Sequence, residues 1–293
     1  MVQVAPVTLS TADVLPVIDL STYLAKGGSS GDGNAGEEHR LLCLQVADML
    51  KSTGCLVVRD PRVDHSENDR FLDMMEDYFS RSAGEKDRDS RPQLSFQVGY
   101  TPEGTEVPRA VKDQELQKKI ASMSQEHRAI PPAGADAKCR YMWPLRERRS
   151  NMYKGLNPNH VVPEGIPGWN AQMNGWGEKM LKTVETVSEM AALGFGLPAD
   201  AFTSRMLNGP HILAPTGSDL KKNSKLGTVY AGYHYDLNFL TIHGKSRFPG
   251  LCVWLRDGRR AAVSIPDGCL LLQAGRQLEW LTGGEVMAGG HEG

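Results

Sequence analysis

The sequence lacks the features that mark several large classes of protein. It contains no apolar run near the roughly 20 residues that cross a bilayer, and no Cys-x-x-Cys pair. Neither charge dominates, because 33 Lys and Arg residues stand against 35 Asp and Glu residues, for a formal net charge of -2 over 293 residues. This balance argues against a general nucleic-acid binder and against a basic protein of the membrane surface. The first 14 residues lack the basic and apolar segments of a signal peptide.

The cysteines do not form a disulfide or zinc pattern. There are five of them, an odd number, and they are scattered along the chain: Cys43, Cys55, Cys139, Cys252 and Cys269. Such spacing fits reduced thiols in a cytosol. Because hydrophobic residues make up 40% and charged residues 23%, the chain has the composition of a globular protein. We therefore predict a cytoplasmic globular protein.

The first 200 residues mix strand and helix signals. An apolar run that opens at a proline predicts an edge strand over 15–20, and a second apolar run predicts a buried strand over 54–58. Apolar residues at helical spacing predict three helices, over 37–50, 66–80 and 169–191. The Gly/Ser-rich segment 27–36 predicts a loop, and the polar segment 81–144 predicts mostly loop with one helix near 114–123.

Beyond residue 201 the pattern changes to short runs rich in β-branched, aromatic and leucine residues, with turn signals between them. The runs are 211–213, 228–230, 239–242, 251–255, 262–265, 269–272 and 278–281. Many short strands at this spacing predict a β-sandwich or a jelly roll.

His234 and Asp236 are the strongest candidates for chemistry. Two residues apart on a strand, their side chains point to the same face. With a second imidazole from a neighbouring strand they would form a 2-His-1-carboxylate triad, which holds Fe(II) and leaves positions open for substrate and O2. His291 follows after an interval that fits four to five strands, so a jelly roll could bring it beside the pair.

Other histidines compete for a metal role. His65 and Glu67 have the same spacing, but they open a predicted helix, where residues two apart diverge by roughly 200°. We expect both to be surface or capping residues. His243, seven residues after Asp236, is expected to be packed or solvent-facing.

Several segments together resemble the isopenicillin N synthase-like Fe(II)/2-oxoglutarate-dependent dioxygenases, a family abundant in plants. The matching segments, in order, are 15–21, 54–58, 97–100, 193–198, 234–241, 249–253 and 273–278. The resemblance implies a mixed α/β fold with a double-stranded β-helix (jelly-roll) core, an N-terminal α/β region and a long core helix. It also implies three regions: an N-terminal non-haem dioxygenase region over 14–125, connecting loops and the core helix over 126–200, and the core over 201–293.

The resemblance further implies the reaction and its site. His234, Asp236 and His291 would bind Fe(II), with 2-oxoglutarate as co-substrate, O2 as oxidant and ascorbate as a possible reductant. A small organic substrate, specialised-metabolite or hormone-like, would be oxidised at a C–H bond while 2-oxoglutarate becomes succinate and CO2. The aromatic residues Tyr230 and Tyr233 could line the pocket or only pack between strands.

One family feature is absent from the sequence. The family places an Arg-x-Ser pair after the second histidine to hold 2-oxoglutarate, and here no arginine follows His291. We therefore expect a C-terminally truncated core, without the last strand and the C-terminal helices, in which His291 lies on a fraying end beside an unpaired edge. Arg247 or Arg276 could substitute for the missing arginine.

Two alternatives to an active oxygenase remain. The chain could be a catalytically impaired isoform or fragment of such an oxygenase, or a cupin-like metal-binding protein that shares the ligand set. The sequence gives no sign of the oligomeric state.

Overall fold

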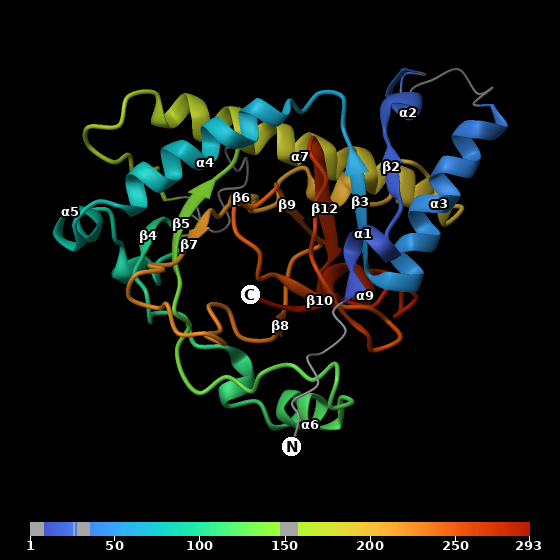
Figure 1. Cartoon of the computed structure of the whole chain (residues 1–293). Helices are drawn as coiled ribbons and strands as arrows, with labels where there is room; N and C mark the ends of the chain where they lie inside the picture. The colour runs from blue at the N-terminus through green and yellow to red at the C-terminus, as the bar shows by residue number, and fades with distance from the viewer. Residues whose placement is uncertain (1–8, 26, 28–35, 147–157) are drawn as a thin grey trace.

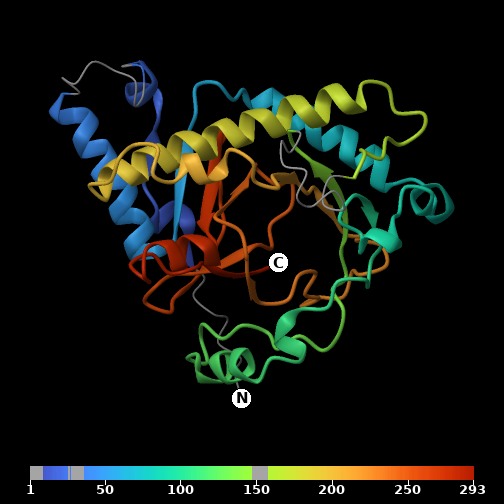
Figure 2. The ribbon, with the colours of Figure 1, turned by 180° about the vertical axis from the view of Figure 1, so that it is seen from behind.

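The computed structural model describes residues 9–25, 27, 36–146 and 158–293 (Figure 1). Of the segment 27–36, which the sequence predicts as a loop, residues 28–35 lie outside the described residues. Strands of three sheets surround the interior, and long helices cover one side of the molecule (Figures 1 and 2). No described helix has both the length and the apolar character needed to pass through a bilayer.

The first sheet carries both predicted strands of the N-terminal region. Its order is β2 (Val17–Asp19), β3 (Cys55–Arg59), β12 (Cys269–Ala274) and β9 (Leu240–His243). The strand β2 lies at the edge and runs parallel to β3, whereas β12 is antiparallel to both of its neighbours. The predicted edge strand and the predicted buried strand are therefore confirmed.

The second sheet has the order β1 (Leu9–Ser10), β11 (Arg260–Ala262), β10 (Cys252–Trp254), β13 (Gly290–Glu292) and β8 (His234–Tyr235). An apolar layer joins it to the first sheet: Cys55, Val57, Cys269 and Leu271 from the first, with Val253, Leu255 and Ala261 from the second. Two sheets packed face to face in this way form the predicted jelly-roll core.

The strand β13 lies inside its sheet. It is antiparallel to β10 on one side and to β8 on the other. His291, at its centre, is only 6% exposed. The expectation of a fraying end is therefore wrong, because β13 is hydrogen-bonded on both sides. The expected unpaired edge is present among the described residues, since β8 beside it is the last strand of the sheet.

A third sheet takes two of its strands, β4 (Gly99–Thr101) and β5 (Cys139–Pro144), from the segment 81–144 that the sequence suggested as mostly loop. It consists of β4, β5, β6 (Ile212–Leu213) and β7 (Thr216–Gly217). In β5 the buried side chains of Cys139, Tyr141 and Trp143 alternate with less buried ones. The loop prediction fails here because the polar and proline-containing neighbours hide this alternation of period two.

The three long helices match the predicted ones. They are α3 (Glu37–Thr53), α4 (His65–Phe79) and α7 (Trp169–Gly194), and α7 crosses the whole molecule (Figure 2). Where α7 ends against α3, Gly194 leaves no room for a side chain, because a Cβ atom would lie 2.2 Å from the Cys43 carbonyl oxygen. The predicted helix near 114–123 is also present, as α6 (Gln114–Ser122).

The remaining helical segments are short. They are α1 (Thr11–Val14), α2 (Ser21–Ala25), α5 (Ala83–Asp87), α8 (Thr203–Met206), α9 (Arg276–Leu281) and the 3-10 turns Pro92–Leu94 and Arg109–Val111.

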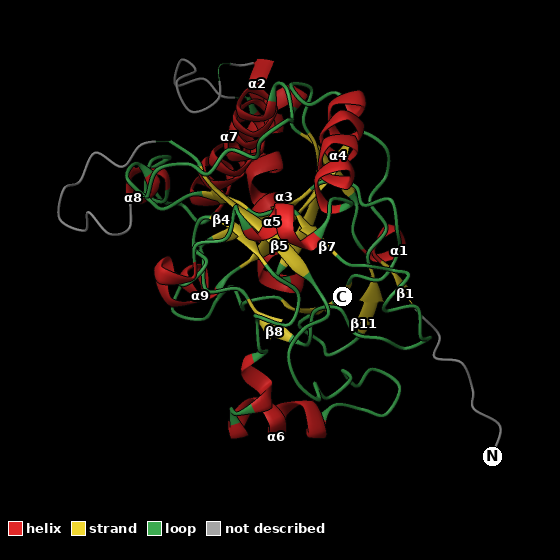
Figure 3. Ribbon diagram, turned by 90° about the vertical axis from the view of Figure 1, so that its left-hand side faces the viewer, coloured by secondary structure: helices red, strands yellow, loops and turns green. Residues whose placement is uncertain are grey.

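Two of the predicted strands are wrong. Segment 278–281 belongs to the helix α9, because all but one of its residues favour helices at least as well as strands and Leu278 alone is buried. Segment 228–230 is irregular and follows Gly227, whose φ of +83° interrupts an extended backbone. The predicted strands 211–213, 239–242, 251–255 and 269–272 are present, with boundaries shifted by no more than two residues (Figure 3). The predicted strand 262–265 shares only its first residue with β11.

Candidate metal centre

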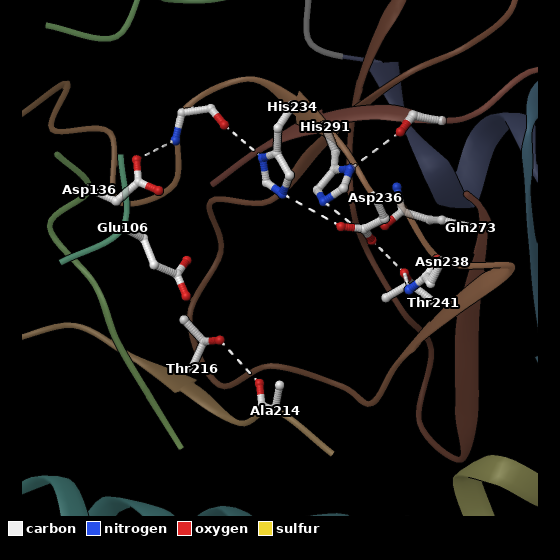
Figure 4. Close-up of polar contacts among 12 residues, drawn as sticks. Glu106, Asp136, Ala214, Thr216, His234, Asp236, Asn238, Thr241, Gln273 and His291 are labelled. Atoms are coloured by element: carbon white, nitrogen blue, oxygen red, sulfur yellow. Dashed lines mark hydrogen bonds and ion pairs between the residues drawn. The ribbon is translucent and has the colours of Figure 1, made fainter. Parts of the chain in front are cut away.

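Three side chains converge at one end of the second sheet. The strands β8 and β13 are antiparallel, and their register places His234 directly opposite His291. Asp236 follows β8 and returns to the same face two residues later. The Nε2 atom of His234 lies 3.7 Å from one carboxylate oxygen of Asp236, and Nε2 of His291 lies 3.9 Å from the other (Figure 4). One ligand atom from each residue falls within 4.8 Å of the others.

Backbone carbonyls orient both imidazoles. Nδ1 of His234 donates to the Gly232 carbonyl at 2.7 Å, and Nδ1 of His291 donates to the Gly289 carbonyl at 3.3 Å. A carbonyl oxygen can only accept, so Nδ1 carries a proton in each ring, and the neutral form of either ring has its lone pair on Nε2. Both lone pairs face the centre of the triad.

Two consecutive side-chain hydrogen bonds hold the Asp236 carboxylate. The Thr241 hydroxyl donates to Oδ2 of Asp236, and the Asn238 amide donates to the Thr241 oxygen at 2.8 Å. Burial alone would raise the pKa of Asp236, but His291 and the Thr241 hydrogen bond outweigh it and hold the pKa below its ordinary value. The carboxylate is therefore ionised at neutral pH.

His291 is uncharged at neutral pH. Burial, reinforced by repulsion from His234, lowers the pKa of His291 to about 3. A neutral imidazole with a free lone pair and an ionised carboxylate are the protonation states that a metal ion requires of its ligands.

The competing histidines lie elsewhere or have other partners. His65 is exposed on α4 and lies 3.6 Å from Asp69, while Glu67 completes the capping box of that helix with Asp64. His243 packs in the interior, where its Nε2 is 2.7 Å from the Gln273 side-chain oxygen. The surface, capping and packing roles expected for these three residues are confirmed.

The tyrosines lie away from the triad. Tyr233 is buried on the face of β8 opposite His234, and its hydroxyl donates to Tyr235 at 2.9 Å. Tyr230 donates to the Asn223 carbonyl at 2.9 Å. Packing between strands, the second of the two expected roles, describes Tyr233.

Neither arginine offers a free guanidinium. Arg247 pairs with Asp73 and Glu76 of α4. Arg276 pairs with Glu279 at 2.6 Å and stacks over Tyr235 on the outer face of β8. Both guanidinium groups therefore have partners in this structure, and the replacement of the family arginine by one of them stays a prediction.

Sequence reasoning missed the residues that support the ligands. Thr241 lies inside the resembling segment 234–241, yet a lone threonine gives no sign of its partner. Asp136 approaches the site from a segment far away in the chain, so no local pattern could mark it (Figure 4). Gln273 lies inside the resembling segment 273–278, but nothing in that segment indicates its contact with His243.

The donor set fits one class of metal site in particular. Two histidine nitrogens and one carboxylate on a single face form the arrangement of non-haem Fe(II) oxygenases, which leaves coordination positions open. A structural zinc site would instead be closed by four ligands, usually with cysteine.

Comparison with known proteins gives a consistent result. No protein-family model matches the chain. A Dictyostelium discoideum protein named as a probable iron/ascorbate oxidoreductase is 23% identical, over 94% of this chain and 75% of the relative. A full-length Neurospora crassa protein, solved in complex with alpha-KG (2-oxoglutarate), superposes with a TM-score of 0.69 at 17% identity, over 95% of this chain and 78% of the fungal chain.

A plant enzyme structure also superposes on most of the chain. The Arabidopsis thaliana dioxygenase for auxin oxidation, in a complex with 2-oxoglutarate, has a TM-score of 0.62 at 15% identity, over 95% of this chain and 86% of the plant chain. The chain has the fold of the 2OG-Fe(II) oxygenases. The predicted resemblance to this family is confirmed, and so is the mixed α/β fold with a jelly-roll core.

Proposed function

We propose that the chain is an Fe(II)- and 2-oxoglutarate-dependent oxygenase that oxidises a small organic molecule. The observation that carries the proposal is the convergence of His234, Asp236 and His291 within a fold shared with such enzymes. Fe(II) with 2-oxoglutarate and O2 supplies an oxidant strong enough for an unactivated C–H bond, and ascorbate would keep the iron reduced. The protein fixes the coordination, positions the substrate and excludes water.

A buried amide beside the triad fits a carboxylate co-substrate. Gln273 on β12 is 1% exposed, and its Nε2 has no hydrogen-bond partner among the described residues, while its oxygen is occupied by His243. Figure 4 shows Gln273 next to Asp236. Since a buried donor without a partner is costly, a bound group that supplies an acceptor accounts for it, and 2-oxoglutarate is such a group.

One pocket among the described residues suits a small substrate with both polar and apolar parts. The pocket has a volume of about 430 Å³, and Glu106 lines it with the apolar side chains of Phe96 and Met142. The Glu106 carboxylate itself lies 3.0 Å from Nζ of Lys138 and 3.4 Å from the Arg140 guanidinium. This volume is typical of sites for small molecules. A specialised metabolite or a hormone-like compound would fit this volume and this mixture of polar and apolar side chains.

Turnover of the co-substrate tests the proposal without knowledge of the substrate. The protein is incubated with Fe(II), ascorbate, 2-oxoglutarate and O2, and succinate is measured against a metal-free control. We expect wild type to form succinate above the control, and Asp236→Ala to form none because one of three ligands is lost. The matched control His65→Ala, which changes an exposed histidine of the same spacing, should behave as wild type.

Absence of succinate from an iron-loaded wild type would contradict the proposal. If 2-oxoglutarate then leaves the spectrum of the bound metal unchanged, the cupin-like alternative is favoured instead.

A further inference from the structure

We propose that Asp136, with Lys138, is a positioning residue for His234, acting through the peptide groups of Gly232. The inference rests on the proposed function, because it assigns these residues a role toward the metal that His234 would hold. Asp136 lies outside both jelly-roll sheets, in the segment that leads into β5.

A chain of two hydrogen bonds joins Asp136 to the candidate ligand. Oδ1 of Asp136 accepts from the Gly232 N–H at 2.9 Å, and the Gly232 carbonyl accepts from Nδ1 of His234 at 2.7 Å (Figure 4). The second bond decides which nitrogen of His234 carries the proton. The first bond fixes the position of Gly232, whose carbonyl accepts that proton.

Asp136 is itself fixed on several sides. Its backbone N–H donates to the Glu106 carbonyl at 2.9 Å, and its carbonyl accepts from Gly104 at 3.1 Å. Lys138 lies 2.7 Å from the Asp136 carboxylate and 3.0 Å from Glu106. The side chain of Asp136 therefore has little freedom to follow Gly232 if Gly232 moves.

The ion pair is almost completely removed from water. Asp136 is 6% exposed and Lys138 is 4% exposed. Desolvation of two charges offsets much of their attraction, so a buried pair is weak evidence for added stability and is better explained by the arrangement that it specifies. Here the arrangement specified is the position of Gly232.

Gly232 is also enclosed by two prolines. A Cβ atom on it would lie 2.8 Å from Cγ of Pro108 and 3.1 Å from Cβ of Pro132. Both prolines come from the same part of the chain as Asp136. The loops before β5 thus hold Gly232 by a hydrogen bond and by direct contact. They thereby position the Gly232 carbonyl, which accepts the hydrogen bond from His234.

Cobalt binding by the full-length protein tests the proposal, since Co(II) occupies non-haem iron sites and reports its coordination in the visible spectrum. Removal of a group that orients a ligand typically lowers metal affinity by about 10- to 100-fold. We expect Asp136→Ala to lose affinity in this range and to show an altered Co(II) spectrum. Asp60→Ala is the matched control, because Asp60 is also a buried carboxylate in an ion pair, but its carboxylate is hydrogen-bonded to Arg62 and to Thr183 of α7.

The outcomes separate the two proposals. Wild type that fails to bind Co(II) contradicts the proposed function. Wild type and Asp136→Ala that bind Co(II) equally tightly, with the same spectrum, contradict only the positioning role. If Asp136→Ala does not fold, Gly232→Ala decides, since its added methyl group meets Pro108 and should weaken Co(II) binding, whereas unchanged affinity would overturn the inference.

Discussion

At the residue scale, the triad depends on side chains that never face the metal. Thr241 donates to the Asp236 oxygen that lies nearer to His291, and Asn238 donates to Thr241. Such partners fix the orientation of a ligand and are worth a large part of its affinity.

Loss of the Thr241 hydroxyl should therefore weaken the site. Thr241→Val keeps the shape of the side chain but leaves Asp236 without its donor, so we expect Fe(II) or Co(II) affinity to fall by about 10-fold or more. Thr241→Ser, which keeps the hydroxyl, should remain within a few-fold of wild type. Equal affinities for the valine and serine variants would show that the hydrogen bond does not support the site.

The sequence predicted the three converging residues but not their supports. His234 and Asp236 share a local spacing, and His291 follows at a distance that a jelly roll can close, a ligand set that the family resemblance also implies. Asp136 lies 96 residues from Gly232, and its contact is polar rather than periodic, so neither spacing nor hydropathy could indicate it.

At the element scale, the helices with strong periodicity match their predictions, whereas some short elements do not. The helix α7 presents buried residues over many turns, whereas β5 has only six residues and α9 one buried residue. A strand such as β13, with three residues, is defined by its partners β10 and β8 more than by its own sequence.

The helix α7 is joined to the end of β3 by a buried carboxylate. Asp60 accepts hydrogen bonds from Arg62 and from the Thr183 hydroxyl of α7, at 2.6 and 2.7 Å. Burial alone would raise the pKa of Asp60, but these hydrogen bonds outweigh it and hold the pKa below its ordinary value.

This lowered pKa predicts how stability depends on pH. A carboxyl group with a lowered folded-state pKa stabilises the fold above its unfolded value of about 4, and this contribution is lost as the pH falls through the folded-state pKa. We expect Asp60→Asn to lower the urea midpoint at pH 7 and the difference from wild type to shrink below about pH 4. The exposed control Asp77→Asn should show no such change, and a difference for Asp60→Asn that persists to pH 2 would contradict the assignment.

At the scale of the whole molecule, one core joins the third sheet to the long helix. Trp143 of β5 is fully buried, and its indole N–H donates to Asn174 of α7 at 2.9 Å. Its ring stacks on His160 with a centroid distance of 3.9 Å.

Truncation of this tryptophan should be among the most destabilising single changes. Trp143→Ala is expected to cost about 3–5 kcal/mol of unfolding free energy, as for other large-to-small changes in a core. Trp280 on α9 is 67% exposed, so Trp280→Ala should stay within about 0.5 kcal/mol of wild type. Similar losses in both variants, measured by urea denaturation, would be inconsistent with this packing.

The central claim is that His291, from a different strand, completes a metal site with His234 and Asp236. Anaerobic Fe(II) titration of the purified chain tests it most directly. The structure predicts one Fe(II) per chain for wild type and for His65→Ala, and no stoichiometric binding for His291→Ala. Binding by His291→Ala as tight as that of wild type would contradict the claim.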